Sequence, residues 1–251
     1  GPLTPTPYDS TNLSVLMWQP PSSVINNELP GTVSDKSVEI GYGVSSHIDS
    51  KDASTGSVVT YKTENVAIGY RAFRAQYGGK NTCLGYGAMG GNSSGQSFTG
   101  TDRESTYCAE NVAIGHTSMA NNTEGIGAVA IGYSAAFNQT LPQYNVAIGY
   151  ECQKMFNENH SAPKCISVGA YSMSMAQGTV SSCISIGYES MNSINTATYC
   201  IAIGHASMKS AISTSKSVVI GYQAGEFMNN NSSVVANYNV AIGSHAGRNL
   251  N

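Results

Sequence analysis

Residues 65–69 of this chain read Asn-Val-Ala-Ile-Gly, and the same five residues return at 111–115, 145–149 and 239–243. Relaxed forms of this stretch, each ending in glycine, bring the number of copies to eleven. Most successive copies lie 16 to 22 residues apart, with two longer gaps of 28 and 30. A short unit at a nearly constant period predicts a solenoid in which each unit forms one coil. The glycines that end the copies are Gly41, Gly69, Gly85, Gly115, Gly132, Gly149, Gly169, Gly187, Gly204, Gly221 and Gly243.

Each copy alternates aliphatic and small residues. Val66 and Ile68 flank Ala67, and in ten copies the middle residue is Ala, Ser, Cys or Val, with Glu39 in the remaining one. This period of two predicts a strand with an aliphatic ladder on one face and a column of small residues on the other. A glycine that recurs coil after coil implies a positive φ or no room for a Cβ atom.

A second column of small residues stands three positions after each glycine, and a bulky apolar residue often follows it. We therefore expect each coil to consist of a strand, a glycine corner, a second short strand and a polar loop. The bulky residues, which stand one position after the small ones, are Phe73, Met89, Met119, Met173, Met191 and Met208.

A coil of about 17 residues buries little apolar surface by itself, so such units need a further covering surface. Small side chains on every coil favour close packing of another backbone. We therefore expect the columns of small residues to face sister chains in a homotrimer, because a closed cyclic assembly leaves no free face.

Composition excludes several classes of function. Charged residues make up only 11% of the chain and the net charge is −3, so no basic surface is available for nucleic acid or an anionic membrane. No apolar run approaches the roughly 20 residues of a membrane span, so no membrane insertion is expected in this segment. The 27 glycines and many Ser, Thr and Asn residues favour strands and tight turns over helices.

Two regions differ in character. Residues 1–36 hold six of the eight prolines and the only tryptophan, Trp18, and we expect them to form a cap on the first coil or a connector to another domain. Residues 37–251 hold the eleven coils. Two insertions, residues 45–61 and 90–108, are too long to belong to the basic coil.

The repeated motif resembles the head repeats of the YadA-like trimeric autotransporter adhesins, which also occur in tail-fibre and attachment proteins of phages and large DNA viruses. The resemblance covers about residues 37–247. It implies an all-β, left-handed parallel β-roll solenoid, assembled as an intertwined or side-by-side homotrimer. It also implies an extracellular position, on a virion fibre or a cell surface, and contact with a glycan or protein receptor on a host or prey cell.

The two insertions carry the candidate receptor-binding residues, because charged loops on a rigid scaffold are where binding residues tend to lie. A solvated loop without a ligand is the alternative. The candidates are Asp49, Lys51 and Asp52 in the first insertion, and Asp102, Arg103, Glu104 and Tyr107 in the second.

An aromatic column directly follows the repeat glycines. It is either a stripe that binds sugars or a structural ladder, and its recurrence along the whole chain favours the ladder. The column consists of Tyr42, Tyr70, Tyr86, His116, Tyr133, Tyr150, Tyr188, His205 and Tyr222.

Neither the histidines nor the cysteines predict a metal site or a cofactor within one chain. One His from each chain of a trimer could meet on the axis and bind a metal or anion, but a place in the aromatic ladder is favoured for His116 and His205. His47, His116, His160, His205 and His245 form no pair at ligand spacing, and no Cys-x2-Cys pair occurs. Cys165, Cys183 and Cys200 precede three successive strands, where a buried ladder of thiols is favoured over a disulfide. Cys83 and Cys152 occupy small-residue columns and are interpreted as packing residues.

The sequence contains no Gly-x-Ser-x-Gly elbow, no phosphate-binding glycine loop and no obvious carboxylate pair. We therefore expect a protein that is not an enzyme, whose outer face or loops bind a receptor. A purely structural spacer and a depolymerase of surface glycans are the alternatives.

Overall fold

The computed structural model describes residues 38–41, 50–51, 58–59, 64–73, 78–90, 108–122, 125–139, 143–155, 164–177, 179–228 and 236–250, with backbone only at 38–39, 50–51, 58–59 and 236. Within these ranges the chain is all-β and contains no helix. The proposed N-terminal segment, residues 1–36, lies outside the described residues.

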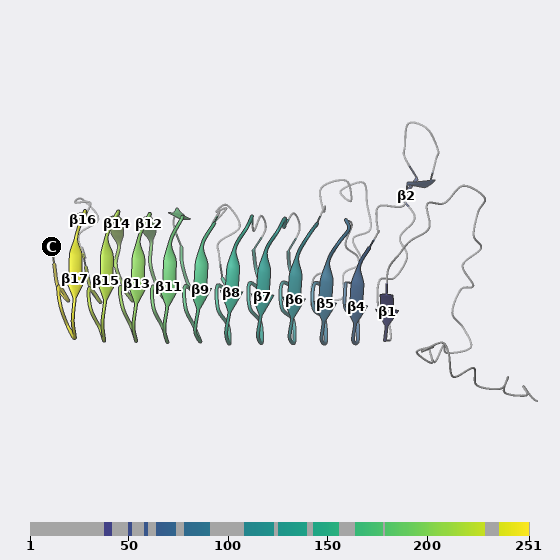
Figure 1. The fold of residues 1–251 in the computed structure, drawn as a ribbon, viewed down its shortest axis with the longest axis horizontal. Coiled ribbons are helices and arrows are strands. Elements are labelled where there is room, and N and C mark those ends of the chain that lie inside the picture. The colour runs from purple at the N-terminus through teal and green to yellow at the C-terminus, as the bar shows by residue number, and fades with distance from the viewer. Residues whose placement is uncertain are drawn as a thin grey trace, which may run out of the picture. The chain divides into compact units, whose positions relative to one another are not determined.

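One strand from each repeat joins a single eleven-stranded parallel sheet (Figure 1). Neighbouring strands pair in register, so that Val66 lies beside Thr82 and Ala67 beside Cys83. Spatial order follows chain order, and the chain is therefore a parallel β-solenoid. The strands are β1 (Val38–Ile40), β4 (Val66–Ile68), β5 (Thr82–Leu84), β6 (Val112–Ile114), β7 (Val129–Ile131), β8 (Val146–Ile148), β9 (Ile166–Val168), β11 (Ile184–Ile186), β13 (Ile201–Ile203), β15 (Val218–Ile220) and β17 (Val240–Ile242).

A second parallel sheet is confined to the last coils. Its strands are β10 (Val180–Ser181), β12 (Thr196–Thr198), β14 (Ser213–Ser215) and β16 (Ala236–Asn237), and each precedes a strand of the eleven-stranded sheet. A separate antiparallel pair, β2 (Ser50–Lys51) and β3 (Val58–Val59), lies within the first insertion. The motif-based prediction missed the second sheet because its residues are not part of the repeated signature.

The repeat glycines meet both conditions expected from the sequence. Their φ angles lie between +124° and +142°. A Cβ atom on Gly85 would lie 2.5 Å from the carbonyl oxygen of Gly115 in the next coil. The backbones therefore approach so closely at this corner that no side chain fits between successive coils.

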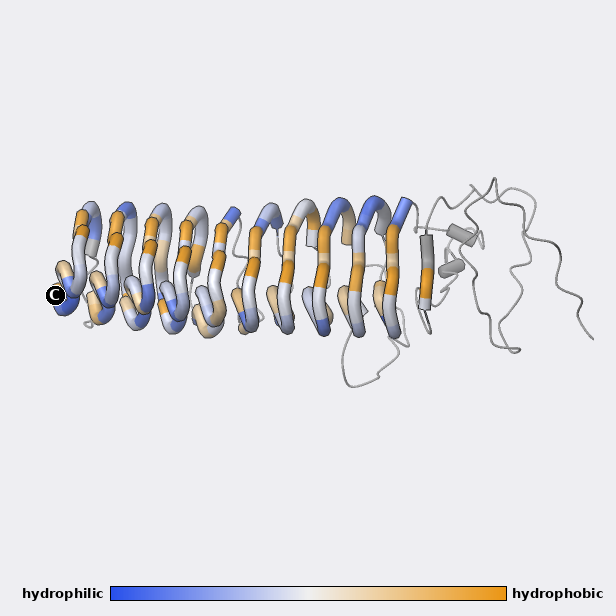
Figure 2. The backbone as a smooth tube through the Cα atoms, turned by 60° about the horizontal axis from the view of Figure 1, so that its bottom comes forward, coloured by the Kyte–Doolittle hydropathy of each residue, from blue (hydrophilic) through white to orange (hydrophobic). Residues whose placement is uncertain are grey.

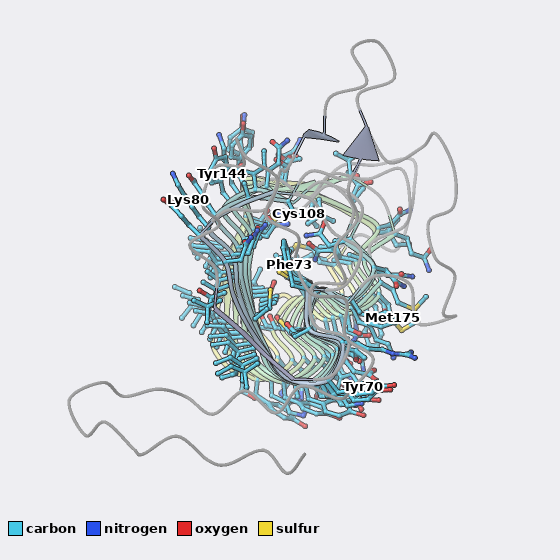
Figure 3. The ribbon with its side chains drawn as sticks, turned by 90° about the vertical axis from the view of Figure 1, so that its right-hand side faces the viewer. Tyr70, Phe73, Lys80, Cys108, Tyr144 and Met175 are labelled. Atoms are coloured by element: carbon cyan, nitrogen blue, oxygen red, sulfur yellow. The ribbon has the colours of Figure 1, made fainter. Side chains whose placement is uncertain are left out.

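The small residues line the interior of each coil, and the prediction that they face sister chains is wrong. Ala67 and Ala72 are fully buried within the single chain, together with the bulky side chain of Phe73 (Figure 3). The aliphatic residues of the strands instead point outward and are half-buried. The physical reason is the narrow cross-section of each coil. A Met or Phe in the turn fits inside only where the facing residue of the strand is Ala, Ser or Cys.

Serine hydroxyls in the interior connect the two walls of successive coils. Ser118 Oγ donates a hydrogen bond to the carbonyl oxygen of Ala130 at 2.9 Å, and Ser190 Oγ donates to that of Ala202 at 3.1 Å. Both serines are fully buried. A column of Ala and Ser therefore fits the interior because each hydroxyl has an acceptor.

The segment after each glycine is a turn, which corrects the expected second strand. Its non-glycine residues adopt positive φ angles at two positions, as in Arg71 (+53°) and Phe73 (+51°). This conformation excludes an extended strand. Successive turns are nevertheless joined by backbone hydrogen bonds, for example from Met89 N to the Ser118 oxygen at 2.8 Å.

Replacing Gly85 with Ala tests the close approach of the coils, and Gly87 supplies a matched control. We expect Gly85→Ala to destabilise the fold by more than about 3 kcal/mol, because its Cβ would overlap the neighbouring backbone. Gly87 also has a positive φ, but its Cβ would meet only Thr117 Cγ2 at 3.5 Å, so Gly87→Ala should cost about 1 kcal/mol. Thermal unfolding followed by circular dichroism measures both, and equal losses would contradict the explanation.

Candidate functional site

Apolar side chains of the eleven-stranded sheet form an outward surface, which we call the aliphatic face. Figure 2 colours the backbone by hydropathy, and hydrophobic residues recur on one coil after another. Leu84 is 42% exposed and Ile166 40%, although both belong to paired strands. An extended, partly exposed apolar surface of this kind is typical of an interaction site. The aliphatic face consists of Val66, Ile68, Leu84, Val112, Ile114, Val129, Ile131, Val146, Ile148, Ile166, Val168, Ile184, Ile186, Ile201, Ile203, Val218, Ile220, Val240 and Ile242, with Thr82 the polar member.

The aromatic residues after the glycines form a stacked column. Ring centroids of Tyr70 and Tyr86 lie 5.0 Å apart, and His116 continues the stack 4.8 Å beyond Tyr86. The stack is interrupted where Ala170 follows the repeat glycine, and Tyr171 fills the place with edge contacts to Tyr150 and Tyr188. Because neighbouring rings cover each other's faces, this column favours the structural ladder over a sugar-stacking stripe. Tyr42 lies outside the described residues.

The histidines of the described residues take part in this aromatic packing. His116 and His205 lie between tyrosines of the column, and His245 contacts the ring of Tyr222 at its end. No group of three potential metal-ligating side chains occurs within the described part of the chain. His47 and His160 lie outside it.

All six cysteines are buried. Cys165, Cys183 and Cys200 stand on successive coils, and the backbone N–H of Cys200 points to Cys183 Sγ at 3.5 Å. The hydrogen bond from Cys183 lowers the pKa of Cys165, and the same bond raises the pKa of Cys183 to about 12. These contacts describe a ladder of thiols, which is the arrangement favoured from the sequence.

An asparagine ladder, not identified from the sequence, occupies the same position in other coils. Asn65 Oδ1 accepts hydrogen bonds from both the backbone N and the Nδ2 of Asn81, and Asn81 Oδ1 accepts the same pair from Asn111. These asparagines are buried. The sequence signal that could have identified this ladder is the Asn that opens the repeat. Its side chain forms hydrogen bonds with backbone groups of neighbouring coils.

A second outward column stands two positions before each strand of the eleven-stranded sheet. From Tyr144 onward it consists of Tyr144, Lys164, Ser182, Tyr199, Lys216 and Tyr238, which we call the corner stripe. Its residues have φ angles between +51° and +65°, so they occupy a tight corner that projects outward (Figure 3). Its tyrosines are 58%, 64% and 70% exposed, against 37% to 49% for the exposed tyrosines of the stacked column.

Hydrogen-bonding side chains run directly beside the corner stripe. Each corner residue follows a Ser, Thr, Asn or Gln in the chain wherever both positions are described from Gln143 onward: Gln143, Ser181, Thr198, Ser215 and Asn237. The backbone keeps this register, since Lys216 N donates to the Thr198 oxygen and Tyr238 N to the Ser215 oxygen. We call these five side chains the polar row.

The corner stripe carries positive charge without a paired carboxylate. Lys216 Nζ lies 2.9 Å from the Tyr238 hydroxyl and 5.0 Å from the centre of that ring, and the contact raises the pKa of Lys216. Among the described residues, Lys164 and Lys216 form no ion pair. The described lysines that do pair with carboxylates are Lys80, Lys154 and Lys209.

The structure does not place the receptor-binding residues proposed from the sequence. Asp49, Asp52, Asp102, Arg103, Glu104 and Tyr107 lie outside the described residues, and Lys51 is described only as backbone of β2. The corner stripe was missed because its tyrosines and lysines recur irregularly and are not part of the repeat motif.

Protein-family models, curated proteins and solved structures offer no match to this chain. Within the described ranges, no helix has the length and apolar character needed to cross a membrane.

Burial predicts that the cysteines are unreactive in the native protein. Desolvation raises the pKa of Cys152 to about 12, so its reactive thiolate form is scarce at neutral pH. We expect a thiol-specific reagent to label none of the six cysteines in native protein at pH 7 and all six in guanidinium chloride. Rapid labelling of native protein would contradict the buried ladder, and fewer than six labels after unfolding without reductant would indicate disulfides.

Proposed function

We propose that this chain is a segment of a homotrimeric attachment fibre, built as a left-handed β-roll, that is not an enzyme and binds a cell-surface receptor. The receptor is a glycan or a protein on a host or prey cell, and the fibre is displayed on a virus particle or a cell. The observation that carries the proposal is the outward aliphatic face, which extends over the coils of the solenoid.

The aliphatic face supports self-association through burial of apolar surface. Ten strands at about 4.8 Å spacing give this face a length of roughly 45 Å. Another copy of the chain offers a face of the same length and chemistry, so parallel copies bury their ladders against one another. The resemblance to YadA-like heads supplies the number of chains. The interface proposed here is the aliphatic face, instead of the small-residue columns expected from the sequence.

A trimeric rod provides three copies of every outward surface. The charged insertions, residues 45–61 and 90–108, and the corner stripe would each occur three times around the fibre axis. Several weak contacts on one stiff body bind a cell more tightly than any one of them, because later contacts form at high effective concentration. This multiplicity supports attachment as the role of the fibre.

Light scattering tests the assembly. We expect a mass three times the 26.2 kDa of one chain. The double variant Ile131→Lys/Ile148→Lys should reduce the mass to that of a monomer, because it places ammonium groups within an apolar interface. Thr198→Lys, on the second sheet, should leave the trimer intact. A folded monomer for the unsubstituted protein, or an unchanged trimer for the double variant, would refute the aliphatic interface.

Binding to whole cells tests attachment. Fluorescently labelled trimer should bind a susceptible cell type saturably, and unlabelled trimer should compete with it. The monomeric Ile131→Lys/Ile148→Lys variant should bind at least about tenfold more weakly, because it loses multivalency. A trimer that binds no cell in a broad panel would indicate a structural spacer.

A further inference from the structure

We propose that the corner stripe and the polar row bind an anionic, extended, β-linked polysaccharide that runs parallel to the stack of coils. The inference rests on the proposed attachment function and names the class of receptor. The surface that carries it extends from Tyr144 to Tyr238 and combines aromatic rings, ammonium groups and hydrogen-bonding side chains.

The tyrosine rings of the corner stripe do not stack on one another and are more exposed to solvent than those of the stacked column. In the stacked column a ring such as that of Tyr70 or Tyr133 is covered by the next ring, about 5 Å away. Tyr144, Tyr199 and Tyr238 stand on coils separated by Lys or Ser, and none of them stacks on another ring among the described contacts. The apolar face of a pyranose ring packs on an exposed aromatic ring of this kind.

Groups of the preceding coil lie against the rings of Tyr144 and Tyr238. A Cβ atom on Gly127 would lie 2.8 Å from Tyr144 Cδ1, so the ring of Tyr144 lies directly against the glycine of the preceding coil. The ring of Tyr238 lies against the ammonium group of Lys216. Rings held in this way lose little conformational entropy when a sugar binds.

The spacing of the tyrosines matches an extended sugar chain. Successive coils are about 4.8 Å apart, so Tyr199 and Tyr238, two coils apart, are separated by about 10 Å along the stack. Tyr144 and Tyr199 are three coils apart, which gives about 14 Å. An extended β-linked polysaccharide advances by about one coil spacing for each sugar. The three rings would therefore contact every second or third sugar of a single chain.

The charge of the stripe selects an anionic polysaccharide. Lys164 and Lys216 lie among the three tyrosines, and neither forms an ion pair within the described residues. The stripe has no carboxylate between Tyr144 and Tyr238. A carboxylate on the sugar chain would give each ammonium group a partner of opposite charge, in a partly exposed position where the attraction depends on salt.

The polar row adds hydrogen bonds along the same line. Thr198 Oγ1 donates to Ser215 Oγ at 3.0 Å, so the hydroxyl groups of adjacent coils are already held in place. Asn237 extends the row by one more coil and is exposed. Sugar hydroxyls donate to and accept from such groups, which supports an elongated site along several coils.

Isothermal titration calorimetry with hyaluronan hexasaccharide and chitin hexasaccharide tests the inference. Both oligosaccharides are β-linked and extended, but only hyaluronan carries carboxylates. We expect the wild-type trimer to bind hyaluronan more tightly, and added salt to reduce the difference. Tyr199→Ala should weaken binding of both oligosaccharides about fivefold, because both lose an aromatic contact. Lys216→Gln should weaken only hyaluronan binding.

Two matched variants serve as controls. Tyr86→Ala removes a tyrosine from the stacked column, and Lys80→Gln removes a lysine from the same corner position far from Tyr199. Neither should change the affinity for the oligosaccharides. The unfolding temperature of every variant should be measured, so that a loss of binding is not confused with a loss of fold.

The inference is overturned if the wild-type protein binds neither oligosaccharide, or if Tyr199→Ala and Lys216→Gln bind as the wild type does. Its failure can be separated from failure of the attachment function. Binding to whole cells without affinity for hyaluronan rejects the polysaccharide site and retains attachment. Loss of both rejects both proposals.

Discussion

The structure depends on how closely successive coils approach at the repeat glycine. A Cβ atom added to Gly85 would lie 2.5 Å from the carbonyl oxygen of Gly115 in the next coil, so no other residue fits at this corner. This approach sets the register of all eleven strands, because each strand ends at the same corner. The narrow coil that results has room opposite Met or Phe only for Ala, Ser or Cys. The aliphatic residues are consequently directed outward.

A solenoid of similar coils places equivalent side chains in a column along the stack. Differences in sequence between neighbouring coils decide whether the side chains of a column cover one another or stay exposed. Tyrosines on consecutive coils cover one another and stabilise the stack, as Tyr70 and Tyr86 do. Tyrosines separated by Lys or Ser, such as Tyr199 and Tyr238, remain largely exposed. The same residue type is therefore structural in one column and available for a ligand in another, because of its neighbours on the coils above and below.

Polar groups in the interior are accommodated by the same repetition. Asn81 satisfies backbone and side-chain groups of the next coil, and Ser118 reaches the strand opposite. In coils where the ladder position is Cys, the thiol of Cys183 makes weaker contacts of the same kind with the next coil. A buried asparagine or serine column is stable here because each coil presents its hydrogen-bond donors and acceptors at the equivalent position to those of the neighbouring coils.

Sequence periodicity by itself determined the solenoid and the glycine corner and favoured the aromatic ladder over a sugar-binding stripe, because each depends on contacts between equivalent residues of neighbouring coils. It did not determine which strand face lies inside, since an alternation such as Val66-Ala67-Ile68 only separates two faces. Only the tertiary structure decided that Ala67 is interior and Val66 exterior, because the width of the coil depends on the turn after Gly69. The exposure of the corner stripe likewise required the fold. Tyr144, Tyr199 and Tyr238 each directly precede a copy of the repeat, but the sequence does not show that this position lies on an outward corner.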